Sequence, residues 1–330
     1  MSARIGLILM KNKKNSKWIA DRFGCPLLVL AAGSLWGLMG LLVRSLNEAG
    51  LSSMEICFVR AVITLVCMLA GLLLLDRKAL KIRLKDIWCF VGTGALSVSF
   101  FNFCYFKTMT LTSLSVAAVL LYTAPAFVML MSAVLFGEKL TLQKVTALIF
   151  AFVGCSFVSG IVGGAGTLSL KGILYGLGAG FGYALYSIFG RYALERNYSS
   201  ITISFYTFLF AAFSSVIFVD GGKVLSTVGS SLQLGCKTVF LVLLVTLIPY
   251  LCYTRGLKGM ENGTASVLAS IEPVVATLVG ILIYKEKMNI WNLLGICLLL
   301  GSIVLINIRF GKEMRGDQKY ERQNLHSLQS

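Results

Sequence analysis

Ten long runs of apolar residues follow one another along the chain, with short polar segments between them. A helix needs about 20 apolar residues to cross the hydrocarbon core of a bilayer. Most of the runs are apolar all round, so their length, rather than their periodicity, predicts membrane-spanning helices. The alternating ten-residue pattern of a membrane β-barrel is absent. The predicted spans are residues 26–45, 54–75, 87–106, 114–136, 145–162, 172–191, 201–219, 238–254, 264–284 and 291–308.

The composition supports this assignment and excludes the ordinary soluble classes. Of the 330 residues, 57% are hydrophobic and 13% are charged, whereas soluble domains are about 45–50% apolar and about 25% charged. The net charge of +16 would suggest nucleic acid in a soluble protein. In a membrane protein, however, basic residues concentrate in cytoplasmic loops. No basic and aromatic cluster of a nucleic-acid-binding type occurs, so no nucleic acid partner is expected.

The distribution of Lys and Arg predicts the orientation in the membrane. With the amino end inside, the inner segments hold 22 of these residues and the outer segments hold seven, while Arg60 lies within the second span. The densest loop, residues 76–86, holds five. The positive-inside rule therefore predicts an even number of spans in the cell membrane, with both termini cytoplasmic. Residues 1–25 and 309–330 are the two expected tails, and the first lacks the apolar core of a signal peptide.

The chain also matches itself. Residues 105–139 align without a gap on residues 253–287, and a shift of 147 aligns Trp36 with Tyr183. Matches among prolines and charges at a constant shift are unlike chance matches among apolar residues. We expect two five-helix repeats, residues 26–162 and 163–308. Because five is odd, the repeats would enter the membrane from opposite sides, and such inverted repeats suit alternating access.

Several motifs together resemble the EamA-type members of the drug/metabolite transporter superfamily. They are Leu35-Trp36-Gly37, Phe58-Val59-Arg60, the segment from Pro125 to Gly137-Glu138-Lys139, the segment Ile271-Glu272-Pro273-Val274-Val275-Ala276, and Tyr284 to Lys287. The resemblance covers about residues 26–308. It implies an all-α integral membrane protein of ten transmembrane helices, arranged as two inverted five-helix repeats. It also implies transport of small solutes, with export preferred over import. Lys285 departs from the pattern, because it stands where the first repeat has Gly137.

Glu272 is the candidate for chemistry within the spans. A carboxylate at that depth costs about 2.5–3.5 kcal/mol on insertion scales, so such groups face a cavity, form a pair or exchange a proton. Two readings stay open: a site for proton coupling or for a substrate amine, and a structural carboxylate bonded to a neighbour. The adjacent Pro273 and its repeat mate Pro125 are expected to bend their helices and free backbone carbonyls beside a cavity.

Other polar and aromatic side chains at membrane depth are further candidates for substrate contact. Arg60 would either extend its side chain to the membrane surface or hold a substrate carboxylate. Trp36 and Tyr183 lie midway in their spans and are assigned to the cavity. Tyr105 and Tyr253 offer a hydroxyl on an apolar body, and Asn102 offers an amide to a substrate or to another helix.

The sequence predicts neither catalysis nor a bound cofactor. The nine cysteines lie mostly in apolar runs without a CxxC pair, the only histidine is His326, and no phosphate-binding glycine loop occurs. These features leave no basis for a metal site or for ATP-driven transport. We therefore expect a secondary transporter of a small organic metabolite such as an amino acid. Its partners would be the solute and the bilayer, and a homodimer is left open. The alternatives are a membrane receptor or scaffold that moves no solute and, less favoured, an intramembrane enzyme.

Overall fold

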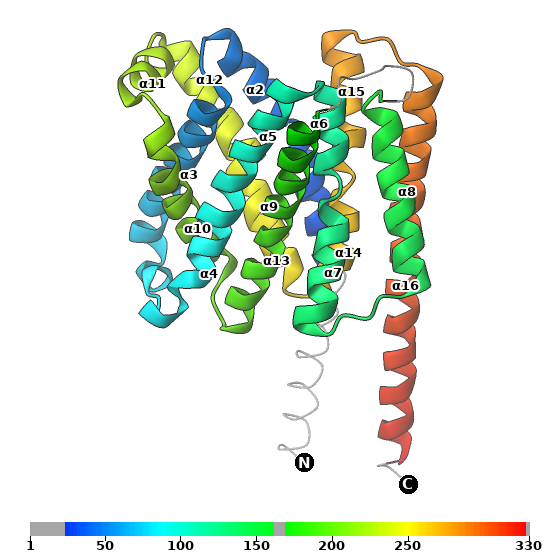
Figure 1. The fold of residues 1–330 in the computed structure, drawn as a ribbon. Coiled ribbons are helices and arrows are strands. Elements are labelled where there is room, and N and C mark those ends of the chain that lie inside the picture. The colour runs from blue at the N-terminus through cyan, green and yellow to red at the C-terminus, as the bar shows by residue number, and fades with distance from the viewer. Residues whose placement is uncertain (1–23, 162–168, 328–330) are drawn as a thin grey trace.

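The computed structural model describes residues 24–161 and 169–327. Of these, residues 309–327 are described by their backbone alone. In the described part, nine helices are long and apolar enough to span a membrane, and the shorter apolar helix Leu142–Val158 is a tenth. They lie roughly side by side in one bundle (Figure 1). Each predicted span coincides with one of these helical segments, so the all-helical fold class is confirmed.

Several spans consist of more than one helical piece. The first half contains a helix over residues 24–36, α2 (Met39–Glu48), α3 (Ser53–Leu75), α4 (Ile87–Val91), η3 (Gly92–Ser99), α5 (Phe100–Leu111), α6 (Leu114–Leu121), α7 (Ala124–Phe136) and α8 (Leu142–Val158). The second half contains α9 (Leu170–Glu195), α10 (Ser200–Ser215), α12 (Leu232–Val242), η5 (Leu243–Leu247), α13 (Ile248–Leu257), α14 (Asn262–Ala269), α15 (Glu272–Tyr284) and α16 (Ile290–Ser327). Short connecting elements are η1 (Arg77–Leu80), η2 (Leu84–Asp86), η4 (Val216–Phe218) and α11 (Gly221–Val228).

Spans four and nine are broken helices at equivalent places. Span four is interrupted at Tyr122–Thr123, between α6 and α7, and Pro125 is in the first turn of α7. Span nine is interrupted at residues 270–271, between α14 and α15, and Pro273 is in the first turn of α15. A proline fits the first turn because the missing N–H has no helical partner there. Each proline therefore stands where a new helix begins, near the middle of its span.

Spans three and eight also deviate from α-helix at equivalent places. η3 and η5 are both π-helical. Residues 95–99 of η3 align with 243–247 at the shift of 148 found in the sequence. Pro249 follows η5 at the start of α13, so the wider turn absorbs the interruption that the proline creates in span eight.

Glycines bring spans one and six against the breaks. A Cβ atom on Gly33 would lie 2.7 Å from the carbonyl oxygen of Ala269, next to the break in span nine. Its repeat mate Gly180 makes the equivalent approach to span four, where a Cβ would collide with the Thr123 hydroxyl. Small residues permit such close packing of membrane helices. Span one therefore supports the break of span nine, and span six supports the break of span four.

The outer surface of the bundle is apolar, as a lipid-facing surface requires. Large hydrophobic side chains are exposed on it, among them Leu74, Leu75, Val134, Leu170 and Phe213. At one edge, α8 and α16 run side by side (Figure 1), and Gly154 and Gly295 meet between them. The bundle thus presents hydrocarbon-compatible side chains outward and keeps its polar groups inside.

Candidate functional site

A small cavity lies where the broken helices face each other. Residues from both sides of the two breaks line it, together with one residue of α9: Leu121, Tyr122, Ala124, Pro125, Val128, Tyr183, Ser266, Ala269, Ser270 and Glu272. The breaks thus expose backbone and short polar side chains at the middle of the membrane, where irregular backbone occurs only beside a cavity or within protein.

Glu272 contributes the charge of this cavity. It is the first residue of α15, where the helix dipole favours a negative group. The phenol rings of Tyr105, Tyr122 and Tyr183 lie within electrostatic reach of its carboxylate, and so does the guanidinium of Arg60. Within the part of the chain that the structure describes, no hydrogen bond or ion pair engages the Glu272 side chain. The carboxylate is therefore available to a solute or a proton.

A second small cavity adjoins the first and is largely aromatic. It is lined by Trp36, Ser97, Val98, Phe101, Tyr183, Tyr186, Ser187, Tyr250 and Tyr253. Tyr183 lines both cavities. The ring of Trp36 lies 5.5 Å from that of Tyr250 and 5.3 Å from that of Tyr253, centroid to centroid. Such rings provide an apolar and polarisable surface for part of a solute.

The tyrosine hydroxyls of this second cavity differ in their engagement. Tyr253 shares a hydrogen bond of 2.8 Å with Ser187, and Tyr186 shares one of 2.6 Å with Thr254. The hydroxyls of Tyr183 and Tyr250 have no hydrogen-bond partner among the described residues. The hydroxyls of Tyr253 and Tyr186 therefore join α13 to α9, while those of Tyr183 and Tyr250 can bond a solute.

The structure separates the predicted site residues into two groups. Trp36, Tyr183, Tyr253 and Glu272 line the two cavities, and Tyr105 stacks on the cavity residue Phe101 with 5.8 Å between ring centroids. Asn102 lines neither cavity: its amide nitrogen donates to the carbonyl of Val98 at 2.7 Å, within its own span. The carbonyl one turn earlier in the helix thus gives this amide a local partner.

Arg60, like Asn102, lines neither cavity. Its Nε donates to the Thr246 hydroxyl at 3.0 Å, so the side chain turns towards span eight and is half-buried. The terminal nitrogens Nη1 and Nη2 form no hydrogen bond or ion pair in the described residues. Because only Nε is engaged, Nη1 and Nη2 together remain able to donate two parallel hydrogen bonds to a carboxylate.

Several cavity residues had no signal in the sequence. Ser266 and Ser270 line the first cavity and Ser97 and Ser187 line the second, yet a serine in an apolar run is ordinary. The π-helical turn of η3 turns Ser97 and Val98 inward, and such turns are frequent at functional sites. In the described residues, no group of three His, Cys, Asp or Glu side chains could hold a metal ion.

The fold and site together define a multi-pass membrane transporter with a central cavity between two repeat halves. The model of the EamA-like transporter family matches residues 24–160 and again residues 170–308. The chain belongs to this family, whose members are transporters and not enzymes.

Individual relatives and a solved structure agree with this assignment. An "Uncharacterized transporter" of Archaeoglobus fulgidus is 25% identical over 264 residues, which cover 80% of this chain and 90% of the relative. The "Uncharacterized inner membrane transporter YicL" of Salmonella typhimurium is 24% identical over 295 residues, which cover 85% and 94%. A crystal structure with 18% identity superposes with a TM-score of 0.74 over 88% of this chain and 99% of the other, which shows the same fold.

Proposed function

We propose that the chain is a secondary transporter of a small zwitterionic metabolite such as an amino acid, working by alternating access, with export as its direction. The observation that carries this proposal is the Glu272 carboxylate, which faces a cavity between two helix breaks without a bonding partner in the described residues. An unpaired carboxylate at membrane depth marks a substrate or proton pathway.

The neighbouring groups suit the three parts of an amino acid. Glu272 would receive the amino group, and the free terminal nitrogens of Arg60 would receive the carboxylate. The aromatic cavity around Trp36 and Tyr250 would hold the side chain. Both charged groups lie within electrostatic reach of one another, and no ion pair joins them in the described structure, so a zwitterion can be placed between them.

The same carboxylate would couple transport to protons. A proton and a substrate amine compete for Glu272, because each neutralises its charge. If only one is bound while the cavity changes sides, proton entry drives amine exit. The break beside Pro273 and the mated break beside Pro125 would provide the movable segments that line the pathway.

Reconstituted vesicles test this proposal. A mixture of proteinogenic amino acids is loaded on one side, a pH gradient is imposed, and the amino acids that cross are identified by mass spectrometry. Glu272→Gln keeps the side-chain shape and removes the titration, so it should abolish pH-driven accumulation and can leave exchange intact. Glu48→Gln is the control, because Glu48 is an exposed carboxylate at the end of α2.

Two outcomes would contradict the proposal. Wild-type pH dependence in the Gln variant would show that Glu272 does not couple protons and is structural. Binding of an amino acid without its movement across sealed vesicles would favour the alternative of a receptor or scaffold.

A further inference from the structure

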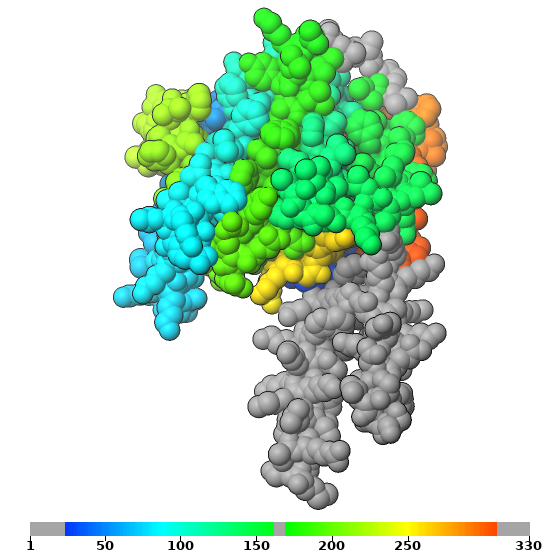
Figure 2. All heavy atoms as spheres, turned by 60° about the horizontal axis from the view of Figure 1, so that its bottom comes forward, coloured from blue at the N-terminus to red at the C-terminus, as the bar shows by residue number. Residues whose placement is uncertain are grey.

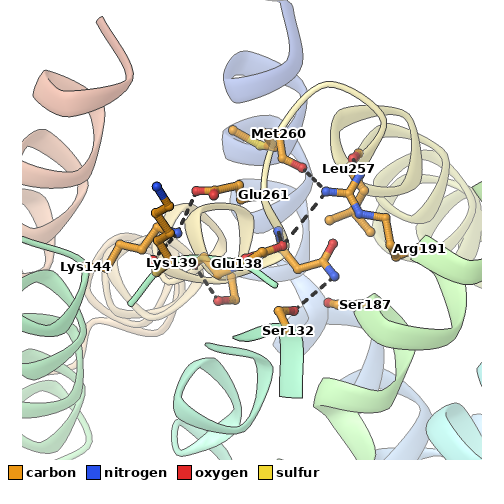
Figure 3. Close-up of polar contacts among 12 residues, drawn as sticks. Ser132, Glu138, Lys139, Lys144, Ser187, Arg191, Leu257, Met260 and Glu261 are labelled. Carbon is orange, nitrogen blue, oxygen red and sulfur yellow. Dashed lines mark hydrogen bonds and ion pairs between the residues drawn. The ribbon is translucent and has the colours of Figure 1, made fainter. Parts of the chain in front are cut away.

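At one end of the bundle, the carboxylate of Glu138 from the first repeat caps a helix of the second repeat. We call this end the Glu138 end; α7 finishes there and α14 begins there. Glu138 follows α7 and accepts hydrogen bonds from the backbone N–H groups of Asn262 and Gly263, at 2.7 and 3.1 Å. These N–H groups begin α14 and have no partner inside their own helix. Figure 3 shows Glu138 and Arg191 lying beside Leu257 and Met260 at this end, and Figure 2 turns this end of the bundle towards the viewer.

Arg191 strengthens the same contact by donating to two backbone carbonyls and by pairing with Glu138. Its Nη1 donates to the carbonyl of Leu257 at 2.9 Å and its Nη2 donates to that of Met260 at 2.8 Å. Nη2 also lies 3.9 Å from Glu138 Oε1. Arg191 therefore connects the end of α9 to the segment between α13 and α14 and to the end of α7 (Figure 3).

A neighbouring ion pair reinforces the closure. Lys144, in the first turn of α8, lies 2.6 Å from the carboxylate of Glu261, the residue before α14. The side chains of Glu138 and Lys144 are 8% and 6% exposed, and every residue from 262 to 270 is buried. The first half of span nine is thus sealed behind these contacts.

The opposite end carries the same Arg–Glu pair but lacks, among the described residues, the hydrogen bonds that accompany it at the Glu138 end. We call this opposite end, where α15 finishes, the Glu286 end. Arg44 and Glu286 are the repeat mates of Arg191 and Glu138. They lie 4.0 Å apart with side chains 49% and 61% exposed, and Arg44 stacks over Tyr284, 3.8 Å from the ring centroid.

The helix that Glu286 would cap is left open. The mates of Asn262 and Gly263 are Leu114 and Ser115, at the start of α6. Ser113 caps α6 by accepting from the N–H of Val116. The N–H groups of Leu114 and Ser115 donate to nothing in the described structure, and Leu114 is exposed. The N–H groups of Leu114 and Ser115 and the Glu286 carboxylate thus lie at the same end of the bundle without a hydrogen bond between them.

Resting on the alternating access proposed above, we propose that Glu138 with Arg191 and Glu286 with Arg44 are two gates, each closed only when the other is open. In the state seen here the Glu138 gate is closed. In the opposite state, Glu286 accepts from the N–H groups of Leu114 and Ser115, and Arg44 donates to the carbonyls of Met109 and Thr112, which are the mates of Leu257 and Met260.

The two gates are unequal, and this sets the resting state. The mates of Lys144 and Glu261 are Asn292 and Ser113, which cannot form an ion pair. The Glu138 gate therefore has a charged contact that the Glu286 gate lacks. Differential contacts of this kind bias an equilibrium between two conformations, so the state closed at the Glu138 end is favoured without solute.

Accessibility of a cavity cysteine tests the gates without requiring transport. Ser270→Cys places a thiol in the first cavity, on a background with the native cysteines replaced. A membrane-impermeant thiol reagent is applied to vesicles of either orientation, and modification of residue 270 is followed by mass spectrometry. Glu138→Gln removes one of the two hydrogen bonds, because an amide NH2 group cannot accept from a backbone N–H, and it weakens the other by removing the charge. It should therefore raise the modification rate from the Glu138 side by about tenfold and lower it from the other side.

Glu286→Gln is the matched variant with the opposite expectation. It should lower modification from the Glu138 side and leave modification from the Glu286 side at or above the wild-type rate. Rates that rise from both sides in either variant would show general loosening and would overturn the proposal. Unchanged rates in both variants would also overturn it. If the protein transports solute but neither gate variant changes the modification rates as expected, the gates are refuted and the transport proposal stands. The vesicle assay with Glu272→Gln measures a different step.

Discussion

Gly137 and Lys285 occupy the same left-handed backbone conformation, with φ of 67° and 58°, directly after equivalent helices. The second repeat therefore keeps the turn of the first, although a lysine has replaced the glycine. Left-handed backbone costs a residue with a Cβ roughly 1–2 kcal/mol. Lys285 thus holds a strained turn immediately before Glu286.

Lys285→Gly should relieve this strain. We expect the free energy of unfolding to rise by about 1 kcal/mol, since glycine adopts this conformation without the Cβ penalty. Thermal unfolding in detergent measures the change. Gly137→Ala is the reciprocal variant and should lower stability by a similar amount. A lower melting temperature for Lys285→Gly would show that the lysine side chain stabilises the turn more than the strain opposes it.

Gly33→Ala should destabilise the protein at the break of span nine. The new Cβ would lie 2.7 Å from both the Ala269 carbonyl oxygen and an Ile271 methyl group, and overpacking of this kind costs about 1–3 kcal/mol. Gly40→Ala is the control, because a Cβ on Gly40 would have no neighbour within 4 Å. Equal melting temperatures for the two variants would contradict close packing of span one against the break.

Two tyrosines should respond differently to loss of the hydroxyl. Tyr183→Phe removes a hydroxyl that has no partner among the described residues, so solute affinity should fall several-fold while stability stays near wild type. Tyr253→Phe leaves the Ser187 hydroxyl without its partner and should lower the melting temperature, because a buried unpaired polar group is costly. Transport KM and thermal unfolding separate the two effects. The reverse pattern would place the solute against Tyr253 instead.

The charge count makes a separate prediction about topology. A reporter fused at Ser330 and a reporter inserted in the loop of residues 220–237 should lie on opposite sides of the membrane. Accessibility of each reporter in intact cells measures this. Reporters on the same side would contradict the inverted arrangement of the two repeats.

The sequence predicted the elements better than it predicted the site. Run length was enough to identify ten spans, because a bilayer sets the length of a helix independently of its neighbours. The self-match also placed Pro125 and Pro273 at equivalent positions. Asn102 was assigned to substrate contact, or to a bond with another helix, from its depth alone. Its amide instead donates to the Val98 carbonyl one turn earlier in its own span, a local partner that depth alone does not reveal.

The gate residues illustrate the other limit of sequence reasoning. Glu138 stood in a polar segment between predicted spans and Arg191 was the last residue of one, at places where charged residues usually face water. Their burial depends on α14 approaching α7, and α14 is more than a hundred residues further along the chain. The repeat alignment nonetheless contained the clue, since it paired Glu138 with Glu286 and Arg44 with Arg191.

Two distances measured in the same protein test alternating access most directly. Spin labels at Lys139 and Lys258 span the Glu138 end, and labels at their repeat mates Lys287 and Thr110 span the Glu286 end; all four residues are exposed. Pulsed electron resonance on a cysteine-free background gives both distance distributions, with Glu138→Gln as the perturbation. We predict that the first distance lengthens as the second shortens. A fixed distance at either end, or two distances that change together, would contradict the account.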